Sequence, residues 1–277
     1  MDAGFTADDL IEEARGAGHP GLSARTITDW VQRGLLDRPA IQSKGRAKGS
    51  DKALYPQAQR DLLLLLLDKR GNQRNITHLL VVPIGIWVYW GEEYVPTRQA
   101  LRALTNWAKH FETASENRAS VGVDGLMAQI VHPDAGETAR NALRRTLLAA
   151  ATSHKIPQDL SNRIAAVVDP HGEGRVLGLP GIPLQPEKIV GSWLGQRQAM
   201  RRLLARDVKP SALEAARAEL RQTIAEYELL QPALAEAAAI DPYRAIKADA
   251  PSGEQLLQNA ARDLLLPLAV VLDRRHL

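Results

Sequence analysis

The chain has 277 residues, of which 45% are hydrophobic and 4% are aromatic, and it contains no cysteine. That length predicts two compact units or one large one, and the abundance of alanine and leucine favours helices over sheets. The lack of cysteine excludes disulfides and thiolate metal sites. The net charge of +3 is small, but it is unevenly distributed.

The excess positive charge lies in one window near the N-terminal end. The net charge is −4 over residues 1–24, +6 over residues 25–75 and +1 over residues 76–277. A concentrated basic window of this kind indicates an acidic partner such as nucleic acid.

No segment predicts export or membrane insertion. The opening stretch, 1-MDAGFTADDL-10, lacks the basic and apolar regions of a signal peptide. The longest apolar runs, 62–67 and 79–90, are shorter than the roughly 20 residues that a membrane-spanning helix needs. We therefore expect a cytoplasmic, nucleoid-associated protein without a membrane partner.

Two short helices separated by a turn are predicted first along the chain. Thr6 is a good N-cap for a helix that runs to about Ala14. The turn 15-RGAGHPGLS-23 is rich in breakers, and a second helix over 23–34 follows it. The order of helix, tight turn and helix is that of a helix-turn-helix pair.

The helix 23–34 has one apolar face and one polar face. Its apolar residues repeat at helical spacing: Ala24, Ile27, Trp30 and Val31. The opposite face carries side chains that can bond base edges in the major groove, namely Arg25, Thr28, Asp29 and Gln32. We expect a recognition helix, with an ordinary amphipathic core helix as the alternative.

A basic segment follows, and it has no helical stripe until its end. Its cations recur with glycine and serine between them, at Lys44, Arg46, Lys48 and Lys52. Side chains of this kind contact phosphates and give affinity without sequence information. The alternative is a solvated basic loop.

Residues 22-LSARTITDWVQRGLL-36 resemble the second helix of the MerR family of transcription regulators, whose pattern is a Ser or Thr cap, T-I-R-Y-Y-E and then G-L-L. Thr28 and Asp29 stand where that family has arginine and tyrosine. In the family a β-hairpin wing follows and ends in an aromatic residue, a place that Tyr55 occupies here, and a leucine-rich helix comes next. The resemblance covers about residues 5–80. It implies a winged helix-turn-helix fold and a homodimer on double-stranded DNA.

Residues and resemblance together predict a sequence-specific, double-stranded DNA-binding transcriptional regulator, with helix 23–34 in the major groove and a basic wing over 44–52 on the phosphates. The expected DNA-binding residues are Arg25, Thr26, Thr28, Asp29, Gln32, Arg33, Lys44, Arg46, Lys48, Lys52 and Tyr55. A recombination or replication accessory factor, or a protein-interaction module, is the alternative use of the same winged helix.

The rest of the chain is predicted to be mainly α. Pro56 begins a leucine-rich helix, and the run 76–90 favours a helix interrupted at Pro83 over a strand. Further helices are expected at about 97–115, 135–153, 157–167, 187–207, 211–239 and 253–275. The segment 169–187 contains four glycines and four prolines, and we predict an irregular loop or linker there.

These elements predict a winged helix-turn-helix DNA-binding domain over 1–90 and a helical bundle over 91–277. The bundle is the expected dimerisation domain, and it is the candidate site for a small-molecule or protein effector.

No group of residues predicts catalysis, so we expect neither an enzyme nor a cofactor. The seven histidines form no H-x-x-x-H pair. His132 with Asp134 could bind a metal ion, but a surface turn before a helix is the simpler interpretation, and no metal site is predicted. The string 171-HGEGR-175 is interpreted as part of a solvated linker.

Overall fold

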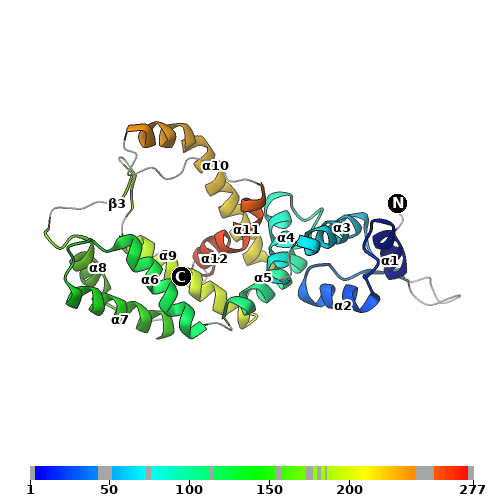
Figure 1. The fold of residues 1–277 in the computed structure, drawn as a ribbon, viewed down its shortest axis with the longest axis horizontal. Coiled ribbons are helices and arrows are strands. Elements are labelled where there is room, and N and C mark those ends of the chain that lie inside the picture. Colours follow the sequence, from blue (N-terminus) through cyan, green and yellow to red (C-terminus); the bar gives the residue numbers. More distant parts are fainter. Residues whose placement is uncertain are drawn as a thin grey trace. The chain divides into compact units, whose positions relative to one another are not determined.

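The computed structural model describes residues 4–42, 52–72, 76–112, 115–153, 157–172, 177–179, 182–184, 186–240 and 253–273. Helices dominate these residues (Figure 1), which confirms the expected mainly α class. The chain divides into two compact units. The first unit contains Met1–His110, Leu203–Arg221 and Pro251–Leu264, and the second contains Phe111–Arg202, Gln222–Ala250 and Leu265–Leu277.

The first unit begins with two helices whose ends are fixed by local caps. In α1 (Ala7–Gly16) the Thr6 side chain accepts from the Asp9 backbone N–H, and the Asp9 side chain accepts from that of Thr6. In α2 (Ala24–Arg33) the Ser23 hydroxyl accepts from the Thr26 backbone N–H, and Gly34 ends the helix in the left-handed conformation. Both predicted N-caps and the predicted stop are therefore confirmed.

A short antiparallel pair, β1 (Ala40–Gln42) and β2 (Lys52–Leu54), separates α2 from α3 (Gln57–Asn72). Ala40 lies opposite Leu54. Tyr55 follows β2, and its backbone exchanges two hydrogen bonds with Phe5, of 2.8 and 2.7 Å. This bridge attaches the end of the strand pair to the residue that precedes α1.

The predicted helix over the apolar run 76–90 is α4 (Ile76–Tyr89), and it continues through Pro83 without the expected interruption. Most of α4 is buried. It lies side by side with α11 (Gly253–Asp263), as Figure 1 shows. A Cβ at Gly85 would lie 2.4 Å from Cδ2 of Leu257, so the glycine permits this close approach. Two further helices contribute to the unit, α5 (Thr97–Glu112) and the beginning of α10 (Pro210–Ile240).

The second unit contains α6 (Ser115–Ile130), α7 (Glu137–Ser153), α8 (Leu160–Val168), α9 (Pro186–Leu204) and α12 (Leu265–Asp273). Of these, α6 was not among the predicted helices. Buried aliphatic side chains from the first four helices form its core: Val123, Leu126, Ile130, Leu143, Leu147, Leu160, Ile164, Val167, Val168 and Val190.

Two predictions are corrected. The segment 169–187 is not wholly irregular, because β3 (Leu177–Leu179) and β4 (Ile182–Leu184) pair antiparallel within it. The single helix expected over 253–275 is divided at Leu264 into α11 and α12. Pro267 then lies in the first turn of α12, where its missing N–H costs no helical hydrogen bond. Among the described residues, no helix has the length and apolar character required to cross a lipid bilayer.

Candidate nucleic-acid interface

The polar face of α2 lies on the surface of the first unit. Ile27 and Trp30 on its apolar face are each 1% exposed. Arg25, Thr28 and Gln32 are exposed. The 3.6-residue repeat produces this division, because burial of the apolar stripe orients the remaining side chains toward solvent.

Several of the predicted DNA-binding residues are bonded within α2. The Arg33 Nε donates to both carboxylate oxygens of Asp29, at 2.9 and 2.8 Å. The Thr28 hydroxyl donates to the Ala24 carbonyl at 2.9 Å. The Thr26 hydroxyl lies 3.0 Å from that of Ser23. Arg25 and Gln32 are thus the long, exposed side chains of this face, with Asp29 and Arg33 forming an ion pair beside them.

The remaining predicted residues lie elsewhere. Tyr55 is buried, which raises the pKa of its hydroxyl, and it packs in the core of the unit. Lys52 begins β2. Lys44, Arg46 and Lys48 lie outside the described residues.

The C-terminal end of α2 is fixed against α5. Gly34 has φ = 86°, and a Cβ at this position would lie 2.4 Å from the Ala103 backbone nitrogen. Asn106 of α5 donates to the Arg33 carbonyl at 3.0 Å. The motif G-L-L therefore forms a packing contact between α2 and α5. Gly34 allows the backbones of the two helices to approach closely, and Leu35 and Leu36 after it are buried.

Asp37, three residues after Gly34, forms further bonds between this end of α2 and α5. Its carboxyl is 5% exposed and accepts from Arg98 (Nε at 2.9 Å, Nη2 at 2.6 Å) and from Arg102 (Nη2 at 2.8 Å). Its backbone N–H donates to the Gln59 side chain at 2.7 Å. Burial of this carboxyl raises its pKa, but the hydrogen bonds from the two arginines outweigh that effect, and the pKa lies below its ordinary value.

A groove of about 490 Å³ adjoins the end of α2, between α5 and the segment that connects α9 to α10. Its wall includes five cationic side chains: Arg38, Arg98, Arg102, Lys109 and Arg206. No acidic residue is among the described residues that line it. Gln32 belongs both to this wall and to the exposed polar face of α2, so the groove and that face are continuous.

A second hollow, of about 400 Å³, lies along another side of α2. Arg25, Asp29 and Arg33 contribute to it, together with Arg70 of α3. The Arg70 guanidinium carbon lies 5.9 Å from the centre of the Trp30 ring. The polar face of α2 is therefore flanked by cations that come from α3 and from α5.

The groove is not apparent from the sequence. Arg98, Lys109 and Arg206 lie far from α2 in sequence and were included in the expected effector domain. One local signal was present: Arg98, Arg102, Asn106 and Lys109 follow at i, i+4, i+8 and i+11, which places them on one face of a helix. That pattern does not indicate which element packs against this face of α5.

Comparison with known proteins gives no relative for this chain. No family model matches it, and neither does any curated protein or solved structure.

Proposed function

We propose that the chain is a sequence-specific, double-stranded DNA-binding transcriptional regulator, in which α2 enters the major groove. The observation that carries this proposal is the exposed polar face of α2 adjoining a groove lined by five cations. Arginine and glutamine can bond the edges of guanine and adenine, whereas cations beside the helix contact phosphates and orient it. Arg25 and Gln32 are the proposed base readers.

The groove supplies phosphate contacts that do not depend on the loop between β1 and β2. Arg98 and Arg102 neutralise the buried Asp37, so two positive charges face one negative charge there. Arg38, Lys109 and Arg206 are three further cations of the groove wall, and their side chains are exposed. A positive groove next to a recognition helix raises the local affinity for a polyanion.

Arg206 offers separate support for a functional groove. It has φ = 57°, in the left-handed region where glycine is the ordinary residue at the end of a helix. An arginine at such a position costs backbone energy that a glycine avoids. A strained backbone at Arg206, which lines the groove, favours a functional role for its side chain.

The order α1, turn, α2, hairpin and α3 supports a winged helix-turn-helix of the MerR type as the architecture of this region. The proposal extends to a homodimer on a two-fold symmetric site, as that resemblance implies. The mass of the protein–DNA complex in solution, measured by light scattering, tests the dimer: one copy per two-fold site contradicts it.

The phosphate contacts are tested by fluorescence polarisation of the full chain with a random duplex across a salt series. Affinity should fall as salt rises, with a logarithmic slope of about 0.9 for each phosphate neutralised. Lys109→Gln and Arg206→Asn should each reduce that slope by about 1. Asparagine is chosen at position 206 because it tolerates the left-handed conformation. The control is Arg221→Gln, an exposed arginine of the same unit that does not line the groove.

Base reading is tested on duplexes selected from a random pool. Gln32→Ala should cost about 1–3 kcal/mol on the selected site, relax one base position and leave random-duplex binding nearly unchanged. The proposal is wrong if the chain does not bind duplex even at low salt, or if its affinity is indifferent to salt. Equal effects of Arg206→Asn and Arg221→Gln would remove the groove from the interface.

A further inference from the structure

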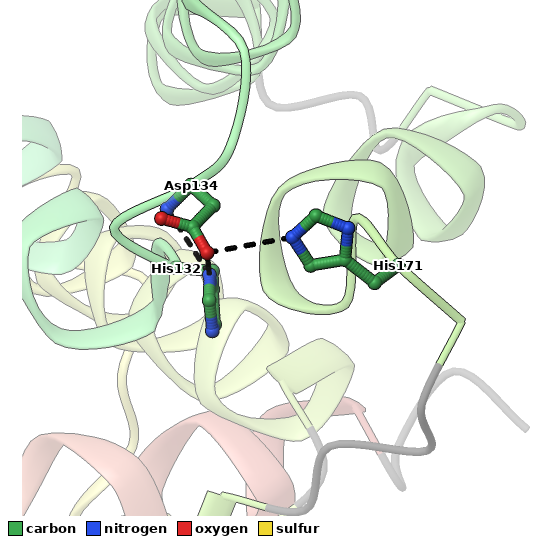
Figure 2. Close-up of side chains that lie close together, drawn as sticks. All are labelled: His132, Asp134 and His171. Atoms are coloured by element: carbon green, nitrogen blue, oxygen red, sulfur yellow. Dashed lines mark hydrogen bonds and ion pairs between the residues drawn. The ribbon is translucent and has the colours of Figure 1, made fainter.

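Three side chains able to ligate a metal ion meet in the second unit (Figure 2). His132 and Asp134 lie in the loop between α6 and α7, and His171 lies just after α8. The Asp134 Oδ2 is 3.8 Å from the His132 Nδ1 and 3.4 Å from the His171 Nε2. Asp134 and His171 are 37 positions apart in the chain, so no local sequence pattern connects them.

We propose that His132, Asp134 and His171 bind a divalent first-row transition-metal ion of the Zn²⁺ class. Zinc lies about 2.0–2.2 Å from nitrogen and carboxylate oxygen, so tetrahedral ligand atoms lie about 3.4 Å apart. The separations of 3.8 and 3.4 Å are close to that spacing, and the donor atoms of all three residues lie within 4.8 Å of one another.

The ligand types determine the metal class. Two imidazoles and one carboxylate suit zinc, cobalt and nickel, whereas magnesium and calcium prefer oxygen ligands alone. The chain has no cysteine, so no thiolate competes for a soft ion. Three protein ligands leave one position of a tetrahedral ion for water.

The backbone around the cluster is held before any ion arrives. The His132 N–H donates to the Val167 carbonyl at 2.8 Å, which attaches the loop to α8. Arg140 of α7 donates to the His132 carbonyl at 3.1 Å. A framework fixed in this way reduces the ordering that metal binding must otherwise impose.

One ring nitrogen of His132 accepts a hydrogen bond within the cluster. The Asp134 backbone N–H donates to the His132 Nδ1 at 3.1 Å, and the same nitrogen lies 3.8 Å from the Asp134 Oδ2. An incoming ion replaces that hydrogen bond with a coordinate bond. The side chains of Asp134 and His171 are 66% and 52% exposed, so the ion reaches the cluster directly from solvent.

The alternative is a surface pair of histidines that share one carboxylate without a metal. It is distinguished by titrating the full chain, prepared without a polyhistidine tag, with Co²⁺. We expect a saturable visible absorption of tetrahedral type at one Co²⁺ per chain, which Zn²⁺ abolishes and millimolar Mg²⁺ does not. His171→Gln and Asp134→Asn should each weaken binding at least about tenfold, since each removes one of three ligands. The matched control is His78→Gln, an exposed histidine of α4 in the other unit.

Circular dichroism of each variant tests whether the helical fold is retained. Because two ligands are substituted separately, the proposal is still tested if one of the two variants does not fold. Zn²⁺ should also raise the melting temperature of the parent chain and of His78→Gln, but not that of the ligand variants. The proposal is overturned if no saturable binding occurs, if both ligand variants retain the parent affinity, or if His78→Gln weakens binding as much as they do.

Discussion

At the scale of single residues, Gly34 shows how one missing side chain fixes the end of the proposed recognition helix. Its φ of 86° and the 2.4 Å between an added Cβ and the Ala103 nitrogen are two separate obstacles to substitution. The first costs about 1 kcal/mol for a non-glycine residue. The second cannot be relieved by a side-chain rotation, because the obstructing atom belongs to the backbone of α5.

We therefore predict that Gly34→Ala lowers the free energy of unfolding by about 3 kcal/mol or more, measured by urea denaturation. Gly16→Ala is the matched control, since Gly16 ends α1 without a positive φ and an added Cβ there meets nothing within 4 Å. It should be neutral or slightly stabilising. Similar losses in the two variants would show that the approach of α2 to α5 does not depend on glycine.

The sequence was informative about residues whose partners are local. Ser23 and Thr6 were predicted as N-caps because a hydroxyl needs only the next helical turn to bond. Tyr55 was predicted on the DNA surface and is buried, because its environment is supplied by Phe5, fifty positions away. The partners of Asp37 on α5 were equally invisible, because no local pattern couples residues 37 and 98.

At the scale of elements, Asp37 connects the end of α2 to α5, and its charge makes that connection depend on pH. The folded-state pKa lies below the ordinary value of 3.8. A carboxyl with a lowered folded pKa stabilises the fold above its unfolded pKa, and that contribution is lost as pH falls through the folded value. The contribution is therefore complete at neutral pH and declines in acid below about pH 4.

We predict that Asp37→Asn costs about 1–3 kcal/mol at pH 7, because it removes a buried charge that two arginines bond. The loss is moderated since Arg98 is 65% exposed and can be solvated by water. The difference from the parent chain should shrink between pH 4 and pH 2, as measured by denaturation at each pH. Asp124→Asn, which breaks the exposed pair with Arg144, should have a much smaller effect. If the difference in unfolding free energy between Asp37→Asn and the parent chain does not change with pH, the charge of Asp37 does not stabilise the contact between α2 and α5.

Elements were predictable where one signal dominated and were mistaken where two signals competed. Helices α1 and α2 have both a cap and an apolar stripe, and both were predicted. The strands β3 and β4 were missed because glycine and proline usually mark loops. In a two-stranded sheet, however, both strands are edge strands. Proline is tolerated in an edge strand although it has no N–H to donate, so Pro183 can lie opposite Gly178.

At the scale of the whole molecule, the first unit is assembled from segments far apart in the chain. The Arg217 Nε donates to the Val88 carbonyl at 3.1 Å, and its guanidinium carbon lies 5.2 Å from the Trp87 ring centre. Leu257 packs against Gly85. The boundary expected at residue 90 followed the resemblance over about residues 5–80 and the end of the apolar run 76–90. The apolar character of α4 indicated that the helix is covered, without indicating which helix covers it.

A fragment that ends at residue 110 should therefore lack part of its own fold. It keeps α1 to α4 and α5 up to His110, but it loses Arg217 and Leu257, which leaves one side of α4 exposed to water. We predict that hydrogen exchange of the α4 amides becomes much faster in the fragment than in the full chain, while the α1 and α2 amides change less, because their contacts lie within the fragment. Co-expression of residues 203–264 as a second chain should restore part of the protection. Equal protection of α4 in the fragment and in the full chain would show that residues 1–110 fold independently, and that α11 rests on a surface already complete without it.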